Sequence, residues 1–266
     1  MSLCPHHQIP AENEAVAQAE RVFQIFLSTD DGSLPPVLET AIKTVQAAFP
    51  QCVHQLWRDA QVRQFIDERF GAVVRKAYDT LVPFAYKCDL ARYCLLHAHG
   101  GWYVDVGVKM RATISAAENV DMIYFRDLGE VGASPFRGTC NCVTGLMYSR
   151  PQSPILQDAI DQVVANCERA FYGVSPLCPT GPVVFGRAIA KYDPDARHVV
   201  GDFMPLTPLF PQRNLCFVLP SGSIVAEHKT MWMPATKPGR FTEFAGSGTN
   251  DYALLWQARA VYRGQE

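Results

Sequence analysis

The centre of the chain, residues 87–109, reads KCDLARYCLLHAHGGWYVDVGVK. Its first half predicts a helix from Pro83 to His99, which Gly100 ends as a left-handed C-cap. Its second half predicts a strand from Trp102 to Met110, whose alternate side chains point to opposite faces. The stretch therefore takes the chain from a helix into a strand through two glycines, with almost no spacer.

The residues before this stretch predict the same alternation of strands and helices. Val22–Leu27 and Cys52–Trp57 are short apolar runs that predict buried strands. Residues 33–49 and Asp59–Arg69 predict helices, the first from apolar residues at helical spacing. This order predicts an α/β fold with a mostly parallel central sheet flanked by helices. Ligands in such sheets bind at the carboxyl ends of the strands.

The rest of the chain continues this pattern without an internal repeat or a low-complexity linker. We expect one domain over residues 1–266, with residues 1–19 as a flexible or helical N-terminal extension. The Pro- and Gly-rich loops at 207–222 and 234–248 have the length of functional lids. Further strands are expected at Met122–Phe125, Val143–Tyr148, Leu215–Leu219 and Ile224–Glu227, and helices at Ser153–Ala170, Pro182–Lys191 and Asp251–Tyr262.

The composition excludes several classes of protein. The formal net charge of −2 provides no basic excess for a nucleic-acid partner. No apolar run approaches the roughly 20 residues that span a bilayer, and the N-terminal region lacks an apolar signal core. The nine cysteines are odd in number and scattered, which is typical of reduced thiols. We therefore expect a cytoplasmic protein without a transmembrane segment.

Asp89 and Arg92 lie three residues apart on the expected helix and so share a face. Taken alone, this spacing favours a surface ion pair worth about 0–1 kcal/mol. Asp105 is an acid in an otherwise apolar strand, and burying it is costly without a cation or hydrogen-bond donor. A metal ion, a ribose hydroxyl group or a lysine would each provide the partner that Asp105 needs.

Residues 87–93 and 100–105 together resemble the donor-site signature of glycosyltransferase family 32. In that family a helix with Ser/Cys-Asp-x-x-Arg-Tyr is followed by Gly-Gly-x-Tyr-x-Asp-x-Asp. The family includes yeast outer-chain mannosyltransferases, bacterial polysaccharide and capsule transferases, and relatives of the clostridial toxin glucosyltransferases. Val22–Leu27, Phe49–Asp59 and Thr180–Pro182 resemble weaker family segments, so that the resemblance covers roughly residues 20–230.

The resemblance implies a GT-A-like fold that binds a nucleoside-diphosphate sugar and retains the anomeric configuration of the transferred sugar. It implies that Asp89 and Arg92 contact the donor sugar and its diphosphate, and that Asp105 contacts the ribose and the metal region. Trp57 either stacks on the nucleobase or is an ordinary core tryptophan. The residues expected to bind the donor are Gly100, Gly101, Tyr103, Gly107, Lys109 and Trp57.

The signature is intact up to Asp105 and broken at Gly107, where the family has a second aspartate that holds Mn²⁺ or Mg²⁺. Negative charge develops on the departing nucleoside diphosphate, so a cation must replace or help to hold the metal. Lys109 is expected on the strand face of Asp105 and Gly107, and Lys229 or an arginine is a further candidate. The alternative is a metal ion held weakly by Asp105 and His228. Lys109 and His228 are equally compatible with ordinary exposed positions.

Two hypotheses of different classes follow. The first is a hexosyltransferase-like enzyme that moves a sugar from a nucleoside diphosphate to a glycan, a lipid-linked intermediate or another acceptor, as in polysaccharide biosynthesis. The second is a non-catalytic sugar-nucleotide-binding or scaffold protein, which the missing second acid keeps open. The sequence itself does not distinguish the donor base, the sugar or the acceptor.

Overall fold

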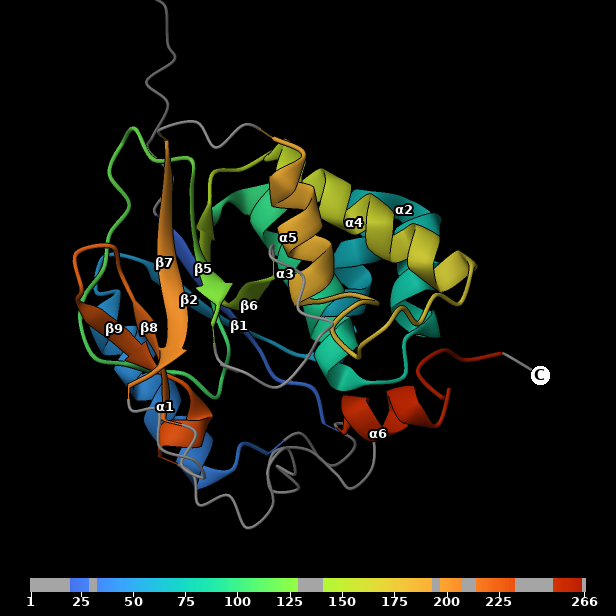
Figure 1. Cartoon of the computed structure of the whole chain (residues 1–266), viewed down its shortest axis with the longest axis horizontal. Helices are drawn as coiled ribbons and strands as arrows, with labels where there is room; N and C mark the ends of the chain where they lie inside the picture. Colours follow the sequence, from blue (N-terminus) through green and yellow to red (C-terminus); the bar gives the residue numbers. More distant parts are fainter. Residues whose placement is uncertain are drawn as a thin grey trace, which may run out of the picture.

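The computed structural model describes residues 20–28, 33–128, 141–192, 197–206, 214–232 and 251–264. The extension expected at residues 1–19 lies outside these ranges, as do most of the two loops expected to act as lids. Within the described ranges, the strands form one nine-stranded sheet with the order β2-β1-β3-β6-β5-β7-β8-β9-β4 (Figure 1).

The first half of this chain alternates strands and helices as the sequence predicts. Its elements are β1 (Arg21–Ile25), α1 (Pro36–Ala48), β2 (Val53–Trp57), α2 (Asp59–Thr80), α3 (Phe84–His99), β3 (Gly101–Val104) and β4 (Lys109–Met110). The helix predicted over Asp59–Arg69 is the first part of α2, which continues past a kink at Gly71, where φ is 77°. Glycine adopts this φ readily, whereas other residues rarely do.

The second half contains shorter connections between its strands. Its elements are β5 (Met122–Asp127), β6 (Cys142–Ser149), α4 (Pro154–Glu168), α5 (Pro182–Ala190), β7 (His198–Pro205), β8 (Leu215–Val218), β9 (Ile224–Glu227), the 3₁₀ turn η1 (Lys229–Met231) and α6 (Tyr252–Gln257). The sequence did not predict β7, and α6 ends five residues before the predicted helix does. None of the helices in the described ranges combines the length and the apolar character needed to cross a membrane.

The sheet is mixed, so the prediction of a mostly parallel sheet was wrong. Among the described strands, β1 pairs parallel with β2 and β3, and β5 pairs parallel with β7. The other pairs, β3–β6, β5–β6, β7–β8, β8–β9 and β9–β4, are antiparallel. A parallel pair needs a long crossover, which α1, α2 and α3 provide in the first half, whereas β8 and β9 are joined by a short turn.

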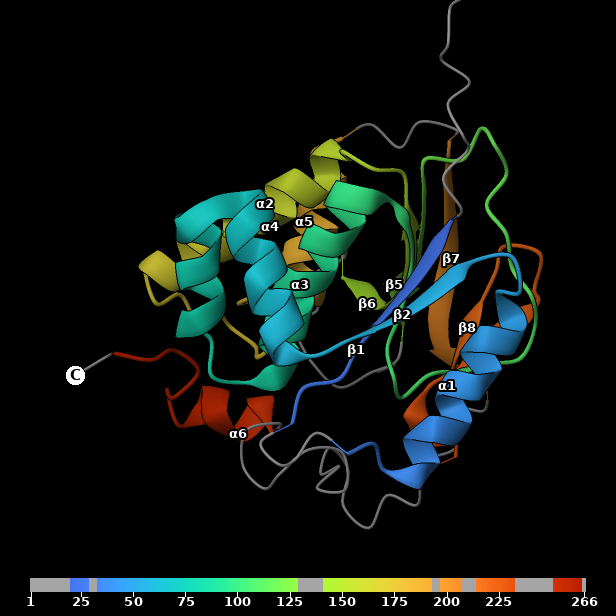
Figure 2. The same ribbon diagram turned by 180° about the vertical axis from the view of Figure 1, so that it is seen from behind.

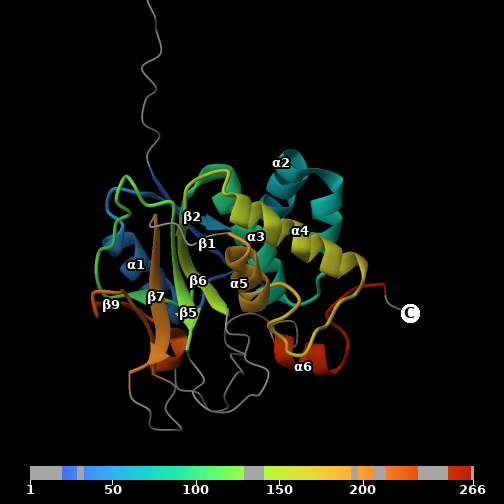
Figure 3. The same cartoon turned by 45° about the horizontal axis from the view of Figure 1, so that its top comes forward.

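Two hydrophobic clusters cover the two faces of the sheet. Trp102 and Val104 of β3 pack with α1 and with β8 and β9, while Tyr103 packs on the other face with α2, α3, α4 and α5. All three side chains are fully buried. Figures 2 and 3 show α1 on one side of the strands and the other large helices on the opposite side. The alternation predicted for Trp102–Val104 is therefore confirmed.

Strands β1 and β3 form a point where the order of the sheet reverses. The chain leaves β1 through α1 to reach β2 on one side, and later returns through α2 and α3 to β3 on the other side. Because β1 and β3 are parallel, their carboxyl ends lie at the same edge of the sheet. Such reversals leave a crevice outside the strand ends, where ligands bind in α/β proteins.

The strand predicted over Trp102–Met110 is broken at Asp105. The N–H of Val108 donates a hydrogen bond of 2.9 Å to the carbonyl oxygen of Asp105, which closes a turn. The chain then enters β4, which pairs with β9 through Lys109 and Glu227 at the far edge of the sheet. The pleat argument that placed Lys109 on the same strand face as Asp105 was therefore wrong, because no strand connects the two residues.

Candidate functional site

Helix α3 carries Asp89 and Arg92 in the interior of the protein. The helix packs against α2, α4, β1, β3 and β6, and residues on all of its sides are buried. Asp89 is 7% exposed and Arg92 is 4% exposed. The alternative of a surface ion pair is therefore wrong: these are interior charges, which proteins keep only when they are paired.

Arg92 lies between two carboxylates. Its Nη1 is 3.2 Å from Oδ1 of Asp105, and its Nη2 is 3.4 Å from Oδ1 of Asp89. The guanidinium also donates hydrogen bonds to the backbone. Its Nε donates to the carbonyl oxygen of Cys88, and its Nη1 donates to the carbonyl oxygen of Thr144. The guanidinium stacks 4.4 Å from the ring centre of Tyr103. Burial would lower the pKa of Arg92, but the nearby acids outweigh this effect and raise it.

Both carboxylate oxygens of Asp89 have partners inside the protein. Oδ1 accepts a hydrogen bond of 3.1 Å from the hydroxyl of Thr144, and Oδ2 accepts one of 2.8 Å from the hydroxyl of Thr180. Gly181 closes the remaining side, because a Cβ there would lie 2.8 Å from Oδ2. Burial raises the pKa of Asp89, and Arg92 and the two threonines oppose that rise. Asp89 is thus an internal support for Arg92.

One carboxylate oxygen of Asp105 is held by neighbouring side chains, and the other remains accessible to a ligand. Its Oδ1 accepts a hydrogen bond of 2.8 Å from the hydroxyl of Tyr103 and also faces Arg92. Its Oδ2 lies beside Gly145, where a Cβ would be only 2.9 Å away. The side chain is 39% exposed and directly follows β3 at the strand-order reversal. A fixed acceptor is thereby presented at the edge of the sheet where ligands bind.

The backbone of Asp105 is held from both neighbouring strands. Its N–H donates a hydrogen bond of 2.8 Å to the carbonyl oxygen of Gly145 on β6. Its carbonyl oxygen receives a long contact, 3.5 Å, from the side-chain amide of Gln24 on β1. Gln24 is fully buried and its own oxygen bonds His54 on β2 at 2.8 Å. The position of Asp105 therefore depends on contacts made by four strands of the sheet.

Lys229 lies on the other side of the turn that follows Asp105. A Cβ on Gly107 would be 3.2 Å from Cδ of Lys229 and 3.4 Å from its Cβ, so the lysine stem covers this glycine. Burial lowers the pKa of Lys229, and the charge of Asp105 opposes that shift. Lys109 instead places its Nζ 4.1 Å from the ring centre of Trp232. Of the two lysine candidates, Lys229 is the one whose charge interacts with that of Asp105.

Residues 35–125 match the family model described as "Glycosyltransferase sugar-binding region containing DXD motif". This segment runs from α1 to β5 and contains Asp89, Arg92 and Asp105. This segment is similar to the sugar-binding region of the DXD-containing glycosyltransferases. The family resemblance seen in the sequence is therefore confirmed, although Gly107 stands where the motif has its second acid.

One relative and two solved structures are similar to the chain over about two thirds of its length. The chain is 27% identical over 198 residues to an uncharacterized glycosyltransferase of Acanthamoeba polyphaga mimivirus, which covers 69% of this chain and 72% of the relative. Two solved structures are more remote. The PaToxG glycosyltransferase is 16% identical, with a TM-score of 0.45, and covers 65% of this chain and 69% of its own. A glycosyltransferase involved in glycosylation of the major capsid of PBCV-1 is 10% identical, with a TM-score of 0.34, and covers 68% and 82%.

The described residues around Asp105 do not include the second acid of the DXD motif. No three His, Cys, Asp or Glu side chains come together as a metal site in the described parts of the chain. The Nδ1 of His228 accepts the N–H of Thr230 at 3.3 Å, and its ring packs on Phe203 with centroids 5.5 Å apart. Next to Asp105 the structure places Lys229, a cation. The residues present therefore do not fit Mn²⁺ or Mg²⁺ at this position.

The paired glycines of the signature lie away from Asp105. Gly100 and Gly101 are at the amino end of β3, and four residues of strand span about 13 Å. A Cβ on Gly101 would lie 2.4 Å from the carbonyl oxygen of Arg21, and one on Gly100 would lie 2.6 Å from Pro151. These glycines permit close packing of β3 against its neighbours. We therefore no longer assign them to donor binding.

Trp57 is at the carboxyl end of β2, next to the strand-order reversal. It is half-buried, and its ring packs edge-on against Phe65 with centroids 5.3 Å apart. Together with Gln55, Leu56 and Gln61 it lines a hollow of about 250 Å³. Trp57 therefore packs against the core and also borders an open space, and its contact with a nucleobase stays a prediction.

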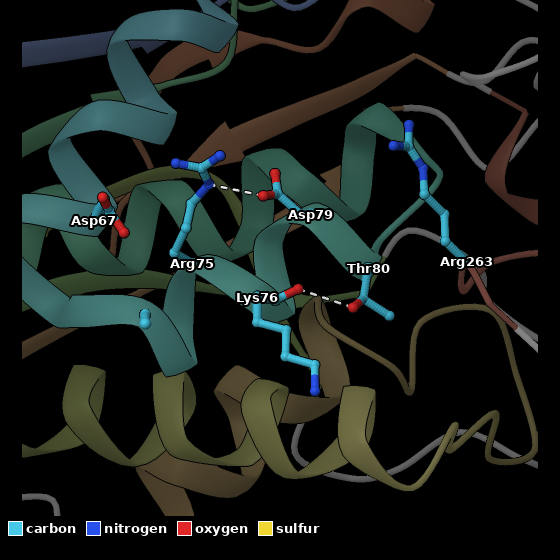
Figure 4. Close-up of a pocket in the computed structure, with 7 residues that line it drawn as sticks. Asp67, Arg75, Lys76, Asp79, Thr80 and Arg263 are labelled. Atoms are coloured by element: carbon cyan, nitrogen blue, oxygen red, sulfur yellow. Dashed lines mark hydrogen bonds and ion pairs between the residues drawn. The ribbon is translucent and has the colours of Figure 1, made fainter.

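A second hollow, of about 470 Å³, lies on α2 and the C-terminal segment (Figure 4). Its walls carry Arg75, Lys76 and Arg263 together with Asp67 and Asp79. Arg75 and Asp79 form an ion pair of 2.9 Å within it. None of the candidate donor-site residues lines this hollow, so its size alone does not make it the functional site.

The sequence analysis did not identify the partners that hold the two acids. Thr144 and Gly145 lie in the expected strand at 143–148, and Thr180 belongs to the Thr-Gly-Pro turn that resembles the family. For Thr144 and Gly145 a signal was present: small or polar residues interrupt an apolar strand, as Gln24 also does in β1. These signals indicate special positions without naming the residues that they contact.

Proposed function

We propose that this glycosyltransferase takes its sugar from a nucleoside-diphosphate sugar, transfers it with retention, and delivers it to a glycan, a lipid-linked intermediate or another acceptor. One observation carries the proposal. Asp105 is held by Arg92 and Tyr103 through Oδ1 and offers Oδ2 at the point where the strand order reverses. The GT-A-like character of the fold and the retention of configuration rest on the family resemblance.

Asp105 is the residue that we place in contact with the donor. A carboxylate accepts hydrogen bonds from hydroxyl groups but repels phosphate, so it suits the ribose or the transferred sugar. Trp57 lies at the end of β2, which is separated from β3 by β1. It provides an aromatic surface for the nucleobase. In this arrangement the nucleoside lies across the carboxyl ends of β1, β2 and β3.

Arg92 and Asp89 act in this proposal as positioning residues. The sequence-based expectation was that both contact the donor directly. The guanidinium of Arg92 already serves two carboxylates and two carbonyl groups, and both oxygens of Asp89 have hydroxyl partners. Their role is to hold the carboxylate of Asp105 in a fixed position, because a preorganised group needs no rearrangement when the reaction occurs.

Calorimetry with a panel of UDP- and GDP-sugars, followed by assays of donor hydrolysis and transfer, tests this function. The proposal expects one donor class to bind and to be hydrolysed or transferred. Tight binding without hydrolysis or transfer to any acceptor would instead favour the non-catalytic sugar-nucleotide-binding protein. Binding of no member of the panel would remove the nucleotide-sugar donor altogether.

A further inference from the structure

Gly107 occupies the position of the second acid in the family motif, and the structure shows what fills the space of its missing side chain. A Cβ at this residue would meet three carbon atoms of Lys229, at 3.2, 3.4 and 3.7 Å. Contacts of 3.2 Å are tighter than the usual distance between packed carbon atoms, which is about 3.5–4.0 Å. A Cβ at position 107 would therefore require the lysine stem to shift by a few tenths of an ångström.

The glycine and the lysine belong together for this reason. Gly107 lies in the turn after β3, and Lys229 directly follows His228 at the end of β9. Their contact is made between parts of the chain more than 120 residues apart in sequence. Because Gly107 has no side chain, the aliphatic stem of Lys229 packs against it, and the charge of Lys229 interacts with that of Asp105.

We propose that Lys229 takes the place of the divalent metal ion and binds the diphosphate of the donor through its ammonium group. The proposal rests on the nucleotide-sugar donor proposed above and concerns the binding of the diphosphate. Its consequence is that the protein binds a nucleoside diphosphate without Mn²⁺ or Mg²⁺.

The charges of the site are consistent with this exchange. Two acids and a divalent cation sum to zero, and so do Asp105 and the ammonium of Lys229. Lys229 is near enough to Asp105 for their charges to interact. A phosphate bound by the ammonium group of Lys229 would receive a charge-assisted hydrogen bond, which is roughly twice as strong as a neutral one, while Asp105 accepts a hydrogen bond from a hydroxyl group of the donor.

The other cations near the turn are less suited to this role. Lys109 sits on the ring of Trp232, and Arg92 is enclosed by Asp89, Asp105 and Thr144. Neither of them is among the atoms nearest to a Cβ on Gly107, which all belong to Lys229. Lys229 is the cation that the structure places against the motif position itself.

Calorimetry of UDP and GDP binding, in EDTA and in Mn²⁺, tests the proposal on the full chain. We expect the wild-type protein to bind one of the two nucleotides with the same affinity, within about twofold, in both conditions. Lys229→Met keeps an unbranched side chain on Gly107 and removes the charge. It should weaken the binding of that nucleotide by about tenfold or more, which is the usual contribution of a charged hydrogen bond. Binding of the corresponding nucleoside, uridine or guanosine, should be unchanged.

A matched control and a second variant make the result specific. Lys191→Met removes an exposed lysine that pairs with Asp158 at 3.0 Å, and should leave nucleotide binding as it is. The double variant Gly107→Asp/Lys229→Ala restores the acid and clears the space, and should bind the nucleotide more tightly in Mn²⁺ than in EDTA.

The outcomes separate this proposal from the function on which it rests. Wild-type binding that requires Mn²⁺, or Lys229→Met binding that equals the wild type, would overturn the role of Lys229 and leave the nucleotide-sugar donor intact. Failure of the wild type to bind either nucleotide in either condition would overturn both. Thermal unfolding of each variant shows whether a loss of binding comes from a loss of fold.

Discussion

Asp89 and Asp105 face the same guanidinium from two very different surroundings. The side chain of Asp89 is 10% exposed and both of its oxygens accept hydrogen bonds from threonines. The side chain of Asp105 is 39% exposed, and only its Oδ1 faces Arg92 and the hydroxyl of Tyr103. One acid is thus enclosed by the protein, whereas the other is held by the protein and directed outward.

One sequence signature can thus contain both a buried structural acid and a partly exposed acid that is open to a ligand. A buried carboxylate whose partners are complete stabilises the charge of Arg92 but has little left to offer a ligand. A partly exposed carboxylate with one oxygen engaged is fixed in direction and still open to a hydroxyl group. Removing Asp105 should therefore harm activity most, and removing Asp89 should harm stability most.

Asp105→Ala is expected to have the largest effect. It should reduce donor turnover by about a thousandfold or more, the upper range for loss of one preorganised polar group in an active site. The melting temperature should change little, because Trp102, Tyr103 and Val104 carry the packing of β3. A transfer or hydrolysis assay together with thermal unfolding measures both. Near-normal turnover in this variant would show that Asp105 is not part of the site.

Asp89→Ala should reverse that pattern and destabilise the protein by about 3–5 kcal/mol, since it removes one of the two carboxylates that pair with the buried Arg92 and the acceptor of two threonine hydroxyls. Asp79→Ala is the matched control. Asp79 pairs with Arg63 and Arg75 on the surface, where such pairs contribute about 0–1 kcal/mol. Urea unfolding of both variants gives the comparison, and equal losses would contradict the interior role of Asp89.

The features of this cluster that could be predicted from sequence are the local ones. Asp89 and Arg92 meet because residues three apart share a helix face, and this spacing needs no knowledge of the fold. The same holds for the alternation of Trp102, Tyr103 and Val104 across the sheet. Whether the pair was exposed or buried did not follow, because that depends on the helices and strands packed around α3.

The features that could not be predicted are set by distant parts of the chain. Thr180 bonds Asp89 across 91 residues, and no spacing rule joins them. β7 was missed because Gly201 and Asp202 interrupt its apolar pattern, although it lies between β5 and β8. Lys109 was misplaced because the turn closed by Val108 ends the strand and sends the chain to β9.

Arg92→Lys tests whether the two acids are coupled. An ammonium reaches one carboxylate but does not reproduce the planar fork that reaches Asp89 and Asp105 together. We expect a loss of about a hundredfold in kcat/KM, or about 3 kcal/mol, with the fold retained. If Arg92 acts through Asp105, the same substitution made in the Asp105→Ala background should cost no further nucleotide affinity. Independent, additive losses would contradict the positioning role.

The smallest effects should come from two glycines, one beside each acid. A Cβ on Gly145 would lie 2.9 Å from Oδ2 of Asp105, and a Cβ on Gly181 would lie 2.8 Å from Oδ2 of Asp89. Gly145→Ala should turn the open carboxylate and weaken nucleotide binding several-fold, at a stability cost below about 1 kcal/mol, because Asp105 has room to move. Gly181→Ala should cost about 1–3 kcal/mol, because Asp89 is enclosed and cannot yield.

Calorimetry and urea unfolding of both glycine variants complete the comparison. The two substitutions add the same methyl group at nearly the same distance from the same kind of atom, so their size and chemistry are matched. Any difference between them must come from the freedom of the acid that they meet. If both variants lose stability equally and bind the nucleotide equally, Asp105 is as confined as Asp89, and its outward oxygen does not distinguish it as the residue that meets the donor.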